Sequence, residues 1–135
     1  MSPSATAPLR ATRHDAIVWG AEVRRVVDAD TLDMLVDTPL FGVVIRVRLA
    51  GVQAPEMHAA DPAIRARAKA ARAWVEAQVP VGAPVLVHSA RPDKYGRRLA
   101  RVVYMRDGAQ ADLSAEVIAA GHARPYDGVG KAGDV

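Results

Sequence analysis

The sequence predicts a mainly β fold of one domain, a small barrel of five strands with two helices on its outside. Two observations lead to this prediction. Segments in which apolar and polar residues alternate lie on both sides of one long segment of helical periodicity, and turn-forming residues separate them. Half of the 135 residues are apolar, which is enough for a single globular domain with a packed core.

The first three strands are predicted over residues 16–30, 31–37 and 42–52, which are rich in valine, isoleucine and leucine. The third strand alternates most clearly, which predicts one buried apolar face and one face that carries basic residues. The apolar face consists of Val43, Ile45, Val47 and Leu49, and the opposite face of Val44, Arg46 and Arg48.

A long helix is predicted over residues 61–79. Asp61 suits the N-cap, Pro62 suits the first helical position, and Gly82 marks the end of the helix. Apolar residues recur at helical spacing along one side, and Trp74 lies beside them as a core residue. The recurring residues are Ile64, Ala68, Ala71 and Val75.

Two further strands and a short helix follow. The strands are predicted over residues 83–89 and 99–105, joined by a charged turn over residues 91–98. Asp112 is the expected N-cap of the short helix, and Gly121 is its expected left-handed C-cap. Five strands with a helix between the third and the fourth are typical of an OB-fold barrel.

Three parts of the chain are expected: a flexible leader over residues 1–15, the barrel domain over residues 16–126 and a flexible tail over residues 127–135. The absence of cysteine excludes disulfides, thiolate metal sites and a cysteine nucleophile. The sequence contains neither the apolar core of a secretory signal nor a run long enough to span a membrane, so we expect a cytoplasmic location.

The formal net charge is +3, and 15 of the 18 basic residues are arginine. The planar guanidinium group fits phosphate oxygens, so a polyanionic partner is expected. A composition biased by a GC-rich genome explains the same charge equally well.

Two acidic residues, Asp28 and Asp30, stand one residue apart where the surrounding sequence predicts a strand. Because successive side chains of a strand point to opposite faces, both are expected on the same face. Their mutual repulsion then requires a counter-charge. Taken alone, the pair is better explained by side-chain turns at a hairpin.

Three segments of the chain carry chemistry: VVDADT (residues 26–31), RVRLAGVQAPE (46–56) and DKYGRR (93–98). In this order they resemble the staphylococcal nuclease (thermonuclease-like) family, and the resemblance extends from Val23 to Tyr126. It implies an SNase-like OB-fold domain that hydrolyses phosphodiester bonds.

The resemblance implies catalytic roles for three residues. Phosphodiester cleavage needs cations around the phosphate, where negative charge accumulates, and a base that takes a proton from the attacking water. Arg48 and Arg97 match the phosphate-binding arginines of the family, and Glu56 occupies the position of its general base.

The resemblance also implies that a Ca²⁺ ion is the counter-charge of the acidic pair. Asp30 would ligate the ion directly and Asp28 through water, with the Gln53 side chain and the Ala54 backbone carbonyl as further ligands. The family has an aspartate at the position of Gln53, so one negative charge is missing. Weak Ca²⁺ binding, or another divalent ion, is therefore expected.

Substrate contacts are expected from Lys94, Tyr95 and Tyr126, through stacking or through contact with phosphate. Tyr126 is equally well explained as a packing residue. Arg46 and His58 are interpreted as surface residues.

The leading hypothesis is a monomeric, calcium-dependent nuclease that acts on DNA or RNA with little sequence specificity and does not contact membranes. The first alternative is a catalytically weakened or inactive SNase-like module that binds nucleic acid, in which Gln53 marks the loss of metal binding. A protein-interaction module is the third possibility.

Overall fold

The computed structural model describes residues 17–37, 40–92 and 98–126. The expected leader and tail, and the residues Lys94, Tyr95 and Arg97, lie outside the described residues. The domain boundaries therefore stay a prediction.

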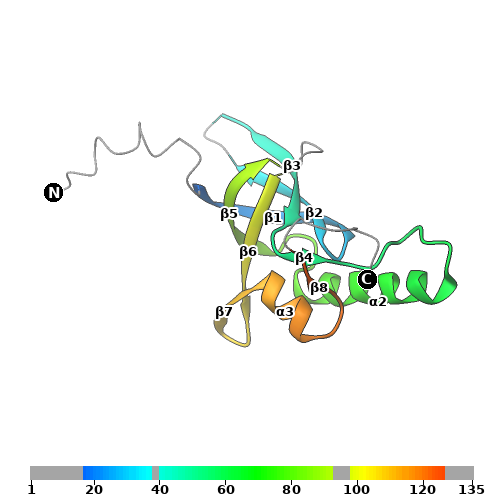
Figure 1. The fold of residues 1–135 in the computed structure, drawn as a ribbon. Helices are drawn as coiled ribbons and strands as arrows, with labels where there is room; N and C mark the ends of the chain where they lie inside the picture. The colour runs from blue at the N-terminus through cyan, green and yellow to red at the C-terminus, as the bar shows by residue number, and fades with distance from the viewer. Residues whose placement is uncertain (1–16, 38–39, 93–97, 127–135) are drawn as a thin grey trace.

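The barrel contains five long strands and carries two helices (Figure 1). The strands are β1 (Ile17–Asp28), β2 (Thr31–Asp37), β3 (Gly42–Leu49), β5 (Pro84–Pro92) and β6 (Arg98–Arg106). The helices are α2 (Pro62–Gln78), between β3 and β5, and α3 (Leu113–Ala119), after β6. These bounds confirm the five predicted strands and both helices.

The sheet closes on itself. Its five long strands are paired in the order β3-β2-β1-β5-β6, and the parallel pairing of β3 with β6 closes the barrel. A short sixth strand, β7 (Ala109–Asp112), extends the sheet beyond β6. Val47 pairs with Arg98 and Leu49 with Ala100 in this closing contact. The closed five-stranded barrel with a helix between the third and fourth strands confirms the predicted OB fold.

The turn between β1 and β2 corrects one prediction. β1 ends at Asp28, Ala29 and Asp30 form the turn, and Asp28 pairs with Thr31 across it. Asp28 and Asp30 are therefore not successive residues on one strand face. The chain reversal, rather than strand alternation, brings the two carboxylates near each other.

Helix α2 begins as predicted. The Asp61 carboxylate accepts a 2.8 Å hydrogen bond from the Ala63 backbone N–H, and Pro62 occupies the first turn. The helix buries Ala68, Ala71 and Val75. It ends at Gln78 with Val79 as the C-cap, so the prediction that Gly82 closes the helix is wrong. Gly82 lies in the following turn, where its φ of 91° favours glycine.

Three short strands were not predicted: β4 (Val52–Gln53), β7 (Ala109–Asp112) and β8 (Arg124–Pro125). β7 pairs with β6 and leads into α3, where Asp112 caps the Ser114 N–H as predicted. β4 pairs with β8. Ala120, rather than Gly121, is the C-cap of α3, and Gly121 follows it with a φ of 81°.

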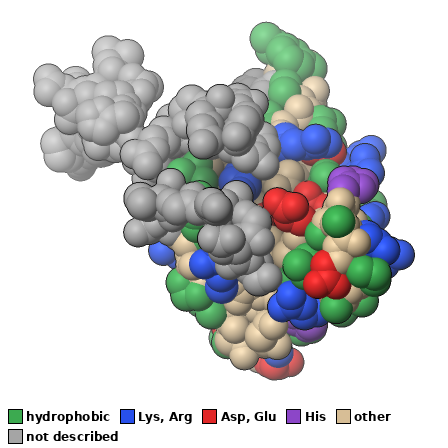
Figure 2. Space-filling view, turned by 45° about the vertical axis from the view of Figure 1, so that its right-hand side comes forward, with side chains coloured by type: hydrophobic (Ala, Val, Ile, Leu, Met, Phe, Trp, Pro, Cys, Tyr) green, Lys and Arg blue, Asp and Glu red, His purple; other side chains and the backbone are tan. Residues whose placement is uncertain are grey.

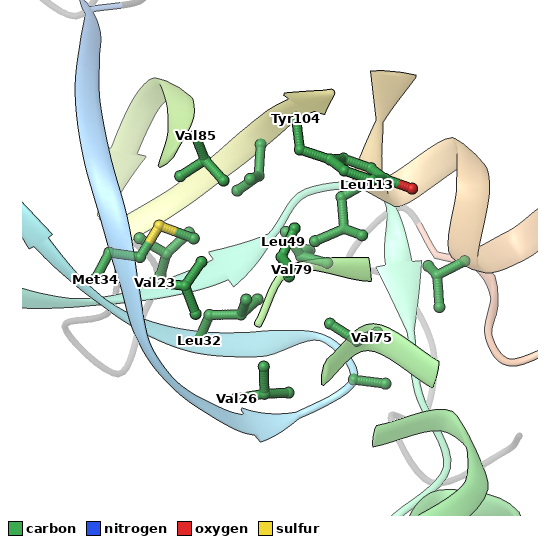
Figure 3. Close-up of a cluster of buried hydrophobic side chains, with 14 of the residues drawn as sticks. Val23, Val26, Leu32, Met34, Leu49, Val75, Val79, Val85, Tyr104 and Leu113 are labelled. Atoms are coloured by element: carbon green, nitrogen blue, oxygen red, sulfur yellow. The ribbon is translucent and has the colours of Figure 1, made fainter. Parts of the chain in front are cut away.

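The core lies inside the barrel and continues to the two helices at one end of it (Figure 3). Strand residues such as Val23, Leu32 and Leu49 meet Val75 from α2 and Leu113 from α3, and all five are fully buried. Burial of this apolar surface is the main stabilising contribution to the fold. Trp74 packs against the core as predicted.

Replacing a core leucine is expected to destabilise the domain strongly. Leu32 is 0% exposed, so Leu32→Ala leaves a cavity and is expected to lower the free energy of unfolding by about 2–5 kcal/mol. Leu40 is 87% exposed, so Leu40→Ala is the control and should change it by less than about 0.5 kcal/mol. Urea denaturation of both variants measures the difference. Equal losses would contradict the assigned core.

Candidate active site

A cluster of buried polar side chains lies where the β1–β2 turn, the end of β3 and β4 meet. Its members are Asp30 (6% exposed), Thr31 (3%), Arg48 (8%) and Gln53 (7%). Among the described residues, the only other buried polar side chain is that of Ser114. Such a concentration of polar groups in an otherwise apolar interior requires hydrogen bonds between its members.

Asp30 joins the three segments. One carboxylate oxygen, Oδ1, accepts a 2.9 Å hydrogen bond from the Thr31 hydroxyl, and Oδ2 accepts a 3.0 Å hydrogen bond from the Ala54 N–H. The Asp30 backbone carbonyl accepts a 2.8 Å hydrogen bond from the Leu49 N–H. The turn is thereby tied both to β3 and to the loop that follows β4.

Arg48 provides the counter-charge of Asp30. Its Nη1 lies 3.5 Å from Asp30 Oδ2 and donates a 3.1 Å hydrogen bond to the Leu49 carbonyl. Its Nη2 donates a 3.1 Å hydrogen bond to Gln53 Oε1. Strand alternation had predicted an arginine on the open face of β3. The β1–β2 turn and β4 enclose the side chain instead, so Arg48 is buried.

Gln53 contacts two groups of this cluster. Its amide oxygen accepts from Arg48, and its Nε2 donates a 3.2 Å hydrogen bond to the Ala54 carbonyl. The two oxygens predicted as neutral metal ligands, those of Gln53 and Ala54, therefore each already accept one hydrogen bond.

The backbone around Gln53 is held by the C-terminal part of the domain. Gln53 pairs with Arg124 in the β4–β8 ladder, and the Tyr126 N–H donates a 2.9 Å hydrogen bond to the Gly51 carbonyl. The Ser114 hydroxyl donates a 2.8 Å hydrogen bond to the Ala50 carbonyl. Sequence reasoning missed these supports, because two-residue strands and side-chain-to-backbone bonds leave no periodic signal.

Asp28 lies at the edge of the cluster and is half-buried. Burial, followed by the nearby charge of Asp30, raises the pKa of the Asp28 carboxyl above its usual range. His58, Arg72 and Arg46 partly oppose this increase of the pKa. The face drawn in Figure 2 carries acidic side chains beside basic and histidine side chains.

His58 was interpreted from the sequence as a surface residue, and the structure adds that it acts on Asp28 electrostatically, as does Arg72. Arg46 is exposed as predicted and forms hydrogen bonds of 2.7 and 3.0 Å with Asp33. This contact lowers the pKa of the Asp33 carboxyl. The signal that places Arg46 and Asp33 together is strand register, since they pair directly across β2 and β3.

Glu56 is exposed and directly follows Ala54 and Pro55, which are both buried. The Ala54 N–H bond to Asp30 ties the backbone to the polar cluster two residues before Glu56. Within the described part of the chain, the Glu56 carboxylate makes no hydrogen bond or ion pair. A base that acts on water needs such an open carboxylate.

The oxygens around the β1–β2 turn are of the type that calcium prefers, namely carboxylate, amide and backbone carbonyl oxygens. The charge of Asp30 contributes to the raised pKa of Asp28, after burial. Over the described ranges, however, no group of three or more His, Cys, Asp or Glu side chains is arranged to hold an ion. The residues therefore fit a divalent cation in ligand type and offer it little negative charge, which favours weak binding.

The closed five-stranded barrel makes this chain an OB-fold domain. Its buried Asp–Arg pair, and the open carboxylate that follows in the chain, are groups of the kind used in phosphate chemistry. The profile of the family described as staphylococcal nuclease homologue (SNase) matches residues 46–134. The chain belongs to this family.

The matched residues include Arg48, Gln53 and Glu56, whereas Asp28 and Asp30 precede them. Membership indicates a nuclease or a nucleic-acid-binding module, and calcium is the ion that the family generally uses. No curated protein matches the chain. Neither of the described helices is long and apolar enough to cross a membrane.

The pKa of Asp28 leads to a pH-dependent prediction. Folding raises the pKa of Asp28, so its carboxyl ionises more readily in the unfolded chain than in the folded domain. At a pH above the pKa of the unfolded chain, this carboxyl therefore destabilises the domain. Asp28→Asn is expected to raise the Tm by a few degrees at about pH 7 and to leave it unchanged near about pH 3. Thermal unfolding in EDTA across this pH range measures the effect.

Asp33→Asn is the matched control with the opposite sign. The Arg46 contact lowers the pKa of Asp33, so the carboxylate stabilises the domain above the usual carboxyl range and loses this effect as the pH falls through the lowered pKa. This variant should therefore lower the Tm at neutral pH. A change of the same sign in both variants would contradict the assigned environments.

Proposed function

We propose that the chain is a calcium-dependent nuclease that hydrolyses phosphodiester bonds of DNA or RNA with little sequence specificity. The observation that supports this proposal most strongly is the buried Asp30–Arg48–Gln53 cluster, whose Gln53 stands three residues before the open carboxylate of Glu56. In this proposal the cluster supplies a cation for phosphate and oxygens for a metal ion, and Glu56 supplies the base for water.

Arg48 binds the phosphate in this proposal. Its guanidinium group has five N–H donors, and phosphate oxygens gain negative charge as water attacks. Arg97, within the charged segment 91–98, is proposed as the second guanidinium on the same phosphate. Two such groups stabilise the transition state more than the ground state, so they act mainly on kcat.

Glu56 acts as the general base. Its exposed carboxylate takes a proton from the attacking water, and Pro55 restricts the backbone just before it. A bound calcium ion would increase the acidity of that water and neutralise charge on the phosphate. Asp30 would hold the ion directly and Asp28 through water, with the Gln53 and Ala54 oxygens as neutral ligands.

Contacts aimed at phosphate do not distinguish bases, which is why little sequence specificity is proposed. Lys94, Tyr95 and Tyr126 are proposed to contact the nucleotides next to the scissile bond. A monomer that acts in the cytoplasm, away from membranes, completes the proposal.

The second candidate function is a nucleic-acid-binding module without cleavage. The observation that favours it is the neutral amide of Gln53, whose oxygen already accepts from Arg48. Both candidates bind nucleic acid in a salt-dependent manner. Only the nuclease cuts the strand when calcium is present.

Removal of the base separates the two candidates. Glu56→Gln keeps the shape of the side chain and removes its basicity, so cleavage is expected to fall by about 10²- to 10⁴-fold. Glu22→Gln, a partly exposed change on β1, is the control and should retain full activity. Cleavage of labelled single-stranded and duplex substrates with calcium measures both. A wild-type chain that binds strands and cuts none with Ca²⁺, Mn²⁺ or Mg²⁺ would support the binding module.

A carboxylate at position 53 is expected to strengthen metal binding. Gln53→Asp adds one negative charge to the proposed ligands, so half-maximal cleavage should need about tenfold less calcium. Calcium titration of the cleavage rate of the variant and the wild type measures this requirement. An unchanged requirement would exclude Gln53 from the metal site.

A further inference from the structure

We propose that Gln53 is a positioning residue that holds Arg48 for phosphate binding, so that the anion-binding half of the site forms without a metal ion. This inference rests on the proposed function, because it takes a nucleic-acid phosphate as the ligand of Arg48. It assigns to the Gln53 amide a structural task that is separate from contact with a cation.

The hydrogen bonds of Gln53 determine the orientation of its amide. The oxygen faces Arg48 Nη2 at 3.1 Å, and the nitrogen faces the Ala54 carbonyl at 3.2 Å. A reversed amide would place donor against donor at Arg48 and acceptor against acceptor at Ala54. Both neighbours therefore favour the same orientation, with the amide oxygen on the guanidinium group.

The backbone that carries this amide is attached at several points. Val52 and Gln53 pair with β8, and the Ala54 N–H donates to the Asp30 carboxylate. Because the backbone is held on both sides of the side chain, Gln53 can fix the position of the longer and more flexible Arg48 side chain.

The cluster balances its own charge. Asp30 is negative, Arg48 is positive and lies 3.5 Å from it, and Gln53 is neutral. Buried charges are stable when they are paired and hydrogen-bonded, and both conditions are met by groups of the chain. A divalent cation is thus not needed to assemble this part of the site.

Arg48 keeps donors for a ligand. Its two hydrogen bonds, to Leu49 and Gln53, and its ion pair with Asp30 involve Nη1 and Nη2 only. A guanidinium group has five N–H donors, so others can meet phosphate oxygens. The side chain is held at one end and retains part of its hydrogen-bonding capacity, which is the arrangement of a preorganised anion site.

The test measures binding of a fluorescein-labelled single-stranded oligonucleotide by anisotropy in EDTA, over a series of salt concentrations. The variants are Gln53→Met, Arg48→Met and the double variant. The control is Gln110→Met, because Gln110 is an exposed residue of β7. Thermal unfolding of each variant establishes that the barrel is intact under the assay conditions.

Wild-type chain is expected to bind in EDTA, and Gln53→Met to bind about tenfold more weakly, because Arg48 is no longer held on the phosphate. Arg48→Met should reduce the salt slope by about 0.7, the value of one phosphate contact on a single strand. Gln53→Met should cause little further loss in the Arg48→Met background. The control should bind like wild type.

A second variant tests the charge balance without removing the acceptor. Gln53→Glu still accepts from Arg48, but its added negative charge makes the Asp30–Arg48 cluster net negative, which repels phosphate. Binding in EDTA is therefore expected to weaken, and added calcium should restore it. Unchanged binding of Gln53→Glu in EDTA would overturn the role of the neutral amide.

Three further results would overturn the inference: wild-type binding that requires calcium, Gln53→Met binding equal to wild type, or an equal effect of Gln53→Met with and without Arg48. A failure of the proposed nuclease function would look different. In that case the strand would be bound in EDTA with the expected coupling between the two residues and would stay uncut with calcium.

Discussion

The carboxylate of Asp30 is the interaction on which the site depends. It accepts hydrogen bonds from the residue beside it and from the Ala54 N–H, and it pairs with Arg48 on the neighbouring strand. A buried carboxylate without such partners would destabilise the domain. The hydrogen bonds and the ion pair of Asp30 therefore hold the β1–β2 turn, β3 and the loop after β4 together. Together with the Gln53–Arg48 hydrogen bond, these contacts place an arginine and an amide beside Asp30, and the amide stands three residues before Glu56 in the chain.

Basic side chains of the chain itself act on Asp28 and Asp30, the two carboxylates for which a Ca²⁺ ion was expected as the counter-charge. Arg48 neutralises Asp30 directly, while His58 and Arg72 reduce the increase in the pKa of Asp28. The amide of Gln53 completes the pairing without adding charge. This arrangement has two parts. Arg48 is held in place by groups of the chain itself, and the oxygens around the β1–β2 turn are of a type that suits a weakly bound cation.

Much of the fold was predictable, because long strands and amphipathic helices have a hydrophobic periodicity that can be detected in the sequence. The capping of α2 by Asp61 and of α3 by Asp112 followed from local chemistry alone. The strands β4, β7 and β8 did not, since segments of two to four residues carry no period and exist only through their partners. The candidate site residues were identified from sequence motifs. The motifs did not predict that Arg48 is buried.

The sequence by itself determined the order of the elements, the apolar faces that form the core and the residue types available for chemistry. These are local properties, set by side-chain spacing and hydrogen-bonding capacity. The tertiary structure decided which polar groups meet: that Asp30 lies in a turn, that Arg48 points into the cluster and that Gln53 binds it. Contacts between residues on different strands depend on barrel closure and register, which no single segment of the chain contains.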